Sequence, residues 1–469
     1  MSDSNNQDRN HTADTRNGSQ RVTFSGNLGY ILAVAGSAVG LGNIWRFPYL
    51  AAKYGGGMFL LVYLILLVTF GYALMMSETA LGRMTGKSPV GAFQSFGRQK
   101  WLSFGGWINA IIPMLIMPYY CVIGGWVVKY VWEYLQGHAA QAAADGFFAN
   151  FITDSLGSEI CFAVFLLAAF LVIVAGVKNG IEAVSKVMMP LLVVLAMVTA
   201  VYSVSRPGAL AGVKYLLIPN FSQFSLMTVV AAMGQLFYSL SLAMGILYTY
   251  GSYLKKDSDI EKNTTQVELF DTGIAVLAGL MIIPAVFAFS GGDMATLKAG
   301  PSLMFITLPK VFESMGFSNV IGSVFFLMVL FAALTSAISL FETNVSTISD
   351  ELGMKRIPAS LLVLGISLLL GTASVLGYGV WDFVRIGGMQ ILDFFDFLTN
   401  SLMMPVSAFC TCLLVVCVVG REKLAEEIKF SSPFKREKLY NFVIKYVAPV
   451  FLLIILISSI ASVFGWITI

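Results

Sequence analysis

Apolar segments long enough to cross a lipid bilayer recur along almost the whole chain. A membrane-spanning helix needs about 20 mainly apolar residues. Segments of that length or longer lie at roughly 29–50, 58–82, 105–136, 158–178, 183–204, 227–254, 266–290, 318–350, 357–377, 389–420 and 439–467. This pattern predicts an all-α integral membrane protein with about 11 transmembrane helices.

The composition agrees with a protein that lies mostly in a membrane. Hydrophobic residues make up 57% of the chain and charged residues only 12%, whereas a soluble domain carries about 25% charged residues. The net charge of +3 gives no indication of a nucleic-acid partner, and no obligate protein partner is evident. Residues 1–20 are polar and predict a disordered tail instead of a signal peptide. Residues 21–469 are predicted to form a single transmembrane domain.

Cysteine and histidine are too few and too scattered to indicate an enzyme. The chain has 5 cysteines and 2 histidines, and the cysteines fall in apolar segments, where we interpret them as packing residues. An intramembrane enzyme needs a nucleophile with a base, or a set of metal ligands. An ion channel should show a repeated filter sequence or a ring of like charges. The sequence shows neither pattern.

Basic residues cluster in the connections that follow the even-numbered spans. They are Arg83, Lys87, Arg98, Lys100, Lys178, Lys186, Lys255, Lys256, Lys355, Arg356 and those between 421 and 438. Basic loops stay in the cytoplasm, so these connections and the N-terminus are predicted to be cytoplasmic and the C-terminus external. The loops 137–157 and 291–317 are then external, and the second is expected to form a partly helical lid.

Two of the apolar segments carry signals of a helix broken inside the membrane. The run 35–48 holds three glycines within seven residues, followed by Asn, Arg and Pro. The run 234–245 has two serines between flanking glycines. A broken helix exposes carbonyls that bind cations and N–H groups that bind anions. Close helix packing is the alternative for either run alone. With Thr335 and Ser336 also in an apolar segment, we favour a transport site.

These runs resemble the neurotransmitter:sodium symporter family, in its bacterial amino-acid-transporting branch. The resemblance extends from Arg21 into the last span, and 35–48, 234–253 and 331–336 are its most specific parts. It implies a 5+5 inverted repeat with discontinuous helices 1 and 6. Repeat one is expected at about 21–205, repeat two at about 225–420 and an extra helix at about 439–467.

The family resemblance also implies a function. We expect sodium-driven import of an amino acid, a small-molecule substrate, across the bacterial inner membrane. A proton-coupled or exchanging amino-acid carrier with the same architecture is the alternative.

The resemblance further implies two bound Na+ ions. Sodium site 2 would use carbonyl and hydroxyl oxygens of Gly36, Val39, Ala332, Thr335 and Ser336. Sodium site 1 would use the substrate carboxylate together with Ala38, Asn43, Ser239 and Asp271. Serine and threonine in helices also bond back to carbonyls one turn earlier, which is the alternative explanation for Thr335 and Ser336.

Asp271 departs from the usual family pattern. Without gaps it occupies the position of a sodium-ligating Asn, and with a gap it lies about one turn away, where chloride-independent members carry an acidic residue. Either placement puts a fixed negative charge beside sodium site 1, so we expect Asp271 to substitute for chloride and the protein to need none. The alternative is a short seventh span with Asp271 at its cytoplasmic entrance.

The resemblance implies a substrate pocket that is mostly apolar. Its predicted residues are Ala38, Gly40, Gly42, Ile116, Tyr120, Tyr238, Ser239, Ser241, Ala243, Met244, Ser336 and Leu340. The monoamine branch carries Asp at the position of Gly40, and glycine there leaves room for a substrate carboxylate. Ala243 replaces a common glycine and should narrow the pocket slightly. We therefore expect a neutral, hydrophobic or aromatic amino acid.

Two gates are expected from the same resemblance. At the external gate, Arg46 would pair with Asp396, or with Asp393 as the second candidate, above Tyr120 and Tyr238. Charges that pair in one state and separate in the other suit alternating access.

The internal gate would pair Arg21 with Asp350, supported by Tyr253. Without the resemblance, Arg21 is explained equally well as an ordinary basic residue that flanks a span.

Overall fold

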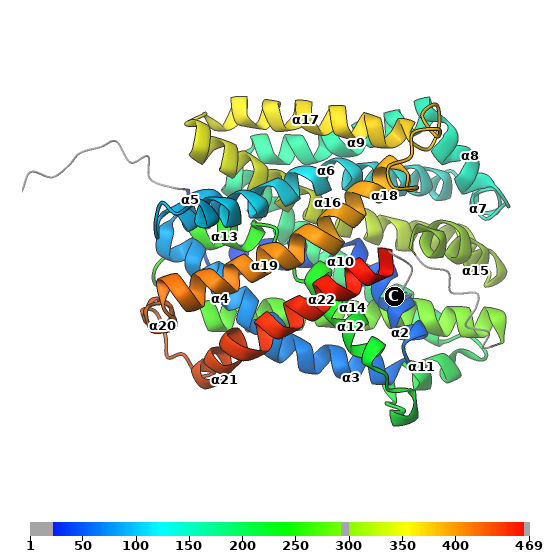
Figure 1. Cartoon of the computed structure of the whole chain (residues 1–469). Coiled ribbons are helices and arrows are strands. Elements are labelled where there is room, and N and C mark those ends of the chain that lie inside the picture. The colour runs from blue at the N-terminus through cyan, green and yellow to red at the C-terminus, as the bar shows by residue number, and fades with distance from the viewer. Residues whose placement is uncertain (1–21, 292–299, 464–469) are drawn as a thin grey trace, which may run out of the picture.

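The computed structural model describes residues 22–291 and 300–463, and over these residues it consists of helices joined by turns and loops, with two isolated β-bridges (Figure 1). Among the described residues, nine helices are long and apolar enough to span a membrane. They are Gly57–Thr85, Lys100–Leu135 (α6), Ser155–Val174 (α9), Val177–Val204, Ile260–Ser290 (α14), Ser318–Leu352 (α16), Arg356–Leu376 (α17), Ile391–Val419 and Glu437–Ser458. The expectation of an all-α membrane protein is confirmed.

The first apolar segment is broken, as its sequence predicts. Helix α1 (Asn27–Ala38) ends where Val39 adopts an extended conformation with ψ of 99°. The chain resumes as Gly42–Lys53, which includes α2 (Phe47–Lys53), and the two parts meet at an angle of 54°. Together they pass for a tenth span.

The sixth apolar segment is broken in a different way. Helix α12 (Leu226–Ser239) and helix α13 (Ile246–Ser252) flank an irregular run at 240–245. Within it Ser241, Ala243 and Gly245 have φ of 54°, 60° and 73°. Left-handed residues cannot continue a right-handed helix, so the ladder of hydrogen bonds ends there.

The seventh spanning helix begins earlier than the sequence suggests. Helix α14 starts at Ile260, not near 266, because the Asp259 side chain accepts a hydrogen bond of 2.9 Å from the Lys262 N–H and caps the helix. Asp271 therefore lies about three turns inside the helix and is fully buried. The interpretation of Asp271 as an entrance residue is wrong.

Burial separates inner helices from outer ones. In α6 and α16, 78% and 72% of the most apolar window is buried inside the protein, against 33% in α9 and 39% in α17. The outer helices expose leucine and valine side chains, for example Leu171 and Leu369, as surfaces in contact with lipid do. The inner helices and the two breaks thus form the centre.

Shorter helices lie at the two ends of the bundle (Figure 1). Helices α5 (Pro89–Gln94), α13 and α20 (Arg421–Lys429) lie at one end, and α7 (Ala139–Ala142), α8 (Phe147–Thr153), α11 (Ala209–Leu217) and α15 (Leu308–Ser314) at the other. We call the first end the basic face, because it carries Lys87, Lys178, Lys256 and Lys355. The described part of 291–317 includes α15 and is partly helical, as expected.

Candidate binding site between the two broken helices

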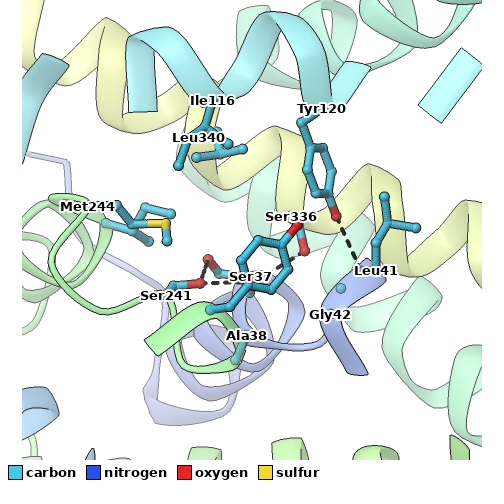
Figure 2. A pocket seen from close by; sticks show the side chains of 13 residues that line it. Ser37, Ala38, Leu41, Gly42, Ile116, Tyr120, Ser241, Met244, Ser336 and Leu340 are labelled. Atoms are coloured by element: carbon cyan, nitrogen blue, oxygen red, sulfur yellow. Dashed lines mark hydrogen bonds between the residues drawn. The ribbon is translucent and has the colours of Figure 1, made fainter. Parts of the chain in front are cut away.

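The two breaks meet around a small cavity of about 30 Å³ at the centre of the bundle (Figure 2). Its lining comes from both breaks, α6 and α16, and consists of Ser37, Ala38, Gly40, Leu41, Gly42, Ile116, Tyr120, Tyr238, Ser241, Met244, Ile246, Ser336 and Leu340. Ten of the twelve residues predicted for the substrate pocket are among them. Ser239 and Ala243 do not line the cavity, and Ser37, Leu41 and Ile246 were not predicted.

Hydroxyl groups join the two breaks directly. The hydroxyls of Ser37 and Ser241 are 3.0 Å apart, and the Ser241 hydroxyl lies 3.1 Å from the Ser37 carbonyl oxygen (Figure 2). The pair lies on the cavity wall near Met244. Segments some 200 residues apart in sequence are therefore fixed to each other at the point where each helix is interrupted.

The predicted residues of sodium site 2 come together where α16 passes the first break. The Ser336 hydroxyl lies 3.2 and 3.3 Å from the carbonyl oxygens of Gly36 and Val39, and 3.1 Å from that of Ser37. One hydroxyl proton cannot serve three carbonyls, so the cluster has acceptor capacity to spare. This is the chemistry that a hard cation needs.

Thr335 behaves differently from Ser336. Its hydroxyl bonds back to the carbonyls of Phe331 and Ala332, at 3.0 and 3.1 Å. A Cβ atom placed on Gly36 would lie 3.1 Å from the Thr335 Cβ, so the two residues are in contact. Thr335 thus bonds to carbonyls of the preceding turn, which is the alternative explanation given above, whereas the Ser336 hydroxyl faces the first break. Both residues lie against the break.

Asp271 lies at the centre of the residues predicted for sodium site 1. Its carboxylate accepts hydrogen bonds from the Asn43 amide at 2.7 Å, the Ser239 hydroxyl at 2.8 and 3.0 Å and the Tyr63 hydroxyl at 3.1 Å. Within the described residues, no Lys or Arg forms an ion pair with it. A buried carboxylate needs compensation of its charge, and neutral donors supply only part of it. Ala38, the last residue of α1, lies at the same break.

Two glycines of the first break are required by close contacts. A Cβ atom on Gly40 would lie 2.8 Å from the Ser336 hydroxyl and 3.1 Å from the Tyr120 hydroxyl. On Gly42 it would lie 2.3 Å from the Tyr238 ring. The space beside Gly40 is thus bordered by hydroxyls and by backbone N–H groups of the break, including that of Leu41, which donates to Tyr120 at 3.5 Å. Such groups favour a bound anion.

A second cavity, of about 310 Å³, lies above the first on the side away from the basic face. Arg46, Asp393 and Asp396 all line it. The Arg46 guanidinium lies over the Tyr238 ring, 5.4 Å from its centroid, and the described residues show no ion pair between Arg46 and either aspartate. Asp396 instead accepts hydrogen bonds from Tyr119 at 3.2 Å and Asn400 at 2.6 Å, two residues that sequence reasoning missed.

At the basic face the ends of the two broken helices are in contact. The Phe24 N–H donates to the Tyr253 carbonyl at 3.3 Å. Of the predicted internal gate, Arg21 lies outside the described residues, and Asp350 accepts a hydrogen bond from the Ser88 N–H at 2.8 Å. The Tyr253 hydroxyl donates to Glu342 at 2.7 Å.

Two buried glutamates near the breaks were also missed. Glu78 accepts a hydrogen bond of 3.0 Å from the Ala243 N–H in the second break. Glu342 forms a two-armed ion pair with Arg356, at 3.0 and 2.5 Å. Both lie in apolar segments of the sequence, and a carboxylate in such a segment is a functional candidate by default. The sequence therefore marks Glu78 and Glu342 by the same signal that marks Asp271.

Sequence comparison identifies similar proteins over nearly the whole chain. A model of the Sodium:neurotransmitter symporter family matches residues 21–150 and 149–465. An uncharacterized sodium-dependent transporter of Bacillus subtilis, YhdH, is 33% identical and covers 94% of this chain and 98% of its own length. Another from Methanocaldococcus jannaschii is 34% identical, over 92% of this chain and 89% of its own. The rat sodium- and chloride-dependent taurine transporter is 26% identical, over 87% of this chain and 73% of its own length.

A solved structure has the same fold. The crystal structure of MhsT in complex with L-phenylalanine superposes with a TM-score of 0.84 at 35% sequence identity. The similarity covers 94% of this chain and 100% of that one.

Proposed function

Because the chain belongs to the sodium:neurotransmitter symporter family, a family of sodium-dependent membrane transporters and not of enzymes, we propose that it is a symporter that imports a neutral amino acid with sodium. The observation that carries this proposal is the cavity between the two breaks. There, freed backbone groups and hydroxyls adjoin an apolar wall, the combination that a zwitterion with an apolar side chain requires.

We propose two sodium ions for the transport cycle. Asp271, Asn43 and Ser239 form one cluster with the end of α1, and Ser336 with the carbonyls of Gly36 and Val39 forms the other. Substrate carboxylate and sodium site 1 lie on the same break, so each charge stabilises the other. This mutual stabilisation couples ion to substrate.

The cavity favours a hydrophobic or aromatic side chain. Ile116, Leu340, Met244 and Ile246 contribute apolar side chains to the lining, and no charged residue lines the cavity within the described residues. The bound L-phenylalanine of MhsT supports an amino acid as substrate.

We propose that transport needs no chloride. The buried carboxylate of Asp271, bonded to Ser239 and Tyr63, supplies the negative charge beside sodium site 1. The taurine transporter of rat is named as chloride-dependent, so this proposal separates the present chain from that relative.

We propose that the basic face is cytoplasmic in a bacterial inner membrane, with the N-terminus inside and the C-terminus outside. Basic connections at one end of the bundle support this orientation.

The 310 Å³ cavity is then the external vestibule, where Arg46 pairs with Asp396 when the gate closes, and Tyr120 and Tyr238 close beneath them. The two breaks are corresponding parts of five-helix inverted repeats.

Competition binding with an amino acid and its matching amine tests the site. Phenylalanine and phenethylamine, or leucine and isoamylamine, differ only in the carboxylate. If the space beside Gly40 receives a carboxylate, the amine should compete at least about tenfold less well, since charge-assisted hydrogen bonds are worth about 1.5–3 kcal/mol. Equal competition by the amine would show that no carboxylate is recognised there and would remove the amino-acid assignment.

A further inference from the structure

The connection 420–436, between the last two spanning helices, is bound to parts of the chain that lie far away in sequence. It contains α20 and lies on the basic face beside α4 (Tyr72–Thr85), the second half of the span Gly57–Thr85 (Figure 1). Two arginines hold it there, Arg83 of α4 and Arg436 of the connection itself, and each is the centre of a cluster of polar contacts. Neither cluster belongs to the binding site or to the gates described above.

The first cluster is centred on Arg83, near the end of α4, whose side chain is fully buried. Its Nε pairs with Glu427 of α20 at 2.9 Å, and its Nη1 donates to the Ser258 carbonyl at 2.6 Å. The Ser431 hydroxyl donates to the same carbonyl at 2.7 Å, and Lys256 pairs with Glu427 at 2.8 Å. The connection is thereby fixed both to α4 and to the loop 253–259.

The second cluster is centred on Arg436. Its guanidinium lies 3.6 Å from the centroid of the Tyr72 ring, and its Nε pairs with Glu261 in the first turn of α14 at 3.2 Å. Glu261 also accepts the backbone N–H groups of Lys435 and Arg436, at 2.7 and 3.1 Å, and the Tyr72 hydroxyl at 3.0 Å. Charge-assisted bonds of this kind are about twice as strong as neutral ones.

The loop 253–259, which the first cluster holds, reaches both broken helices. It directly follows α13, the basic-face half of the second broken span. The Tyr253 carbonyl accepts the Phe24 N–H at 3.3 Å, and the Lys255 amine donates to the Ser25 carbonyl at 3.4 Å. Phe24 and Ser25 lead into α1, the basic-face half of the first broken span.

We infer that the connection 420–436 is a strap that holds the basic-face ends of both broken helices in their closed arrangement. The last spanning helix, which lies outside the two proposed repeats, packs on the same partner: the hydroxyls of Tyr440 and Ser77 are 2.8 Å apart. The strap therefore gives this extra helix a role in opening and closing. This inference is independent of the identity of the transported amino acid.

Hydrogen–deuterium exchange on the full-length protein in sodium-free lipid nanodiscs tests the strap. Arg436→Gln removes the ion pair with Glu261, and Glu427→Gln removes the ion pairs with Arg83 and Lys256. Each should speed amide exchange about tenfold or more in 246–262 and in α1, the factor expected for one lost charge-assisted hydrogen bond. Lys429→Gln is the matched control. Lys429 lies in the strap but pairs at 2.8 Å with Glu437, the residue that directly follows the strap, and not with α4 or the loop 253–259. Its loss should change exchange in neither region.

Three outcomes would overturn the inference. Faster exchange confined to 420–436 would show that the connection loosens without affecting the broken helices, and unchanged exchange everywhere would show that it restrains nothing. A uniform rise that includes α9 and α17 would show only lower global stability. If Arg436→Gln does not fold, Ser431→Ala, which removes one bond to the Ser258 carbonyl, gives the same readout in 246–262.

Discussion

In the proposed function, Asp271 is the residue on which chloride independence depends. Wild-type transport should be indifferent to replacement of chloride by gluconate, because the carboxylate already supplies the negative charge. Asp271→Ser should lose transport or become stimulated by chloride. Uptake of labelled substrate in the two anions measures this.

Glu268→Gln is the control for Asp271→Ser. Glu268 is buried one turn away on α14 and makes no hydrogen bond to Asn43 or Ser239 in the structure. The control should keep the chloride indifference of the wild type. A strong chloride requirement in the wild type itself would contradict the role given to Asp271.

Ala243 has a backbone conformation that costs free energy. Its φ of 60° lies in the left-handed region, which alanine adopts at a cost of about 1 kcal/mol relative to glycine. Ala243→Gly should therefore raise the thermal unfolding midpoint in detergent. The same substitution in the regular helix α12, Ala232→Gly, should lower it, because glycine costs about 1 kcal/mol in a helix. A lower midpoint for both variants would contradict the strained conformation.

Functional residues are easiest to predict from sequence where a charged or polar side chain lies in an apolar segment. Asp271 stood out because a carboxylate in an apolar segment needs a reason, and the same test finds Glu78 and Glu342. Thr335 shows where such reasoning ends. Its hydroxyl can face either a break in another helix or its own preceding turn, and the difference depends on the packing of α16, which no local pattern encodes.

At the scale of elements, both breaks were predictable and their geometry was not. Clusters of glycine, serine and asparagine in an apolar segment indicate where helix bonds are lost. They do not show that α1 resumes after three residues with a bend of 54°, or that Ser241 and Ala243 become left-handed in the second break. Those features follow from contacts between the breaks, such as Ser241 with Ser37.

The contact of α16 with the first break is tested by removing its hydroxyls. The double variant Thr335→Ala, Ser336→Ala should weaken sodium-dependent substrate binding at least about tenfold while the protein stays folded. Thr347→Ala is the control, because Thr347 lies three turns further along α16 and bonds only to the Thr343 carbonyl, at 2.8 Å. Unchanged sodium dependence in the double variant would contradict sodium site 2.

At the scale of the whole molecule, the structure has a wide cavity on one side of the site and contacts on the other. Arg46 and Asp396 line that cavity without pairing, while Phe24 and Tyr253 are bonded at the basic face. The resemblance of the sequence to a known family predicts residues for each gate. It cannot indicate which gate is closed, because one sequence must support every state of a transport cycle.

The connection 420–436 was likewise beyond sequence reasoning. Its basic residues indicated a cytoplasmic loop, which is a statement about topology alone. That Arg436 stacks on Tyr72 and pairs with Glu261 depends on how the last helix packs against α4, a contact between segments about 360 residues apart.

Uptake into proteoliposomes tests the central claim most directly. Purified protein, reconstituted without internal amino acids, is supplied with a panel of labelled amino acids under an inward sodium gradient, an inward proton gradient or no gradient. We predict accumulation of a neutral hydrophobic or aromatic amino acid above its external concentration under the sodium gradient alone, in gluconate as well as in chloride. Accumulation under the proton gradient without sodium, or uptake only when amino acids are loaded inside, would contradict sodium symport.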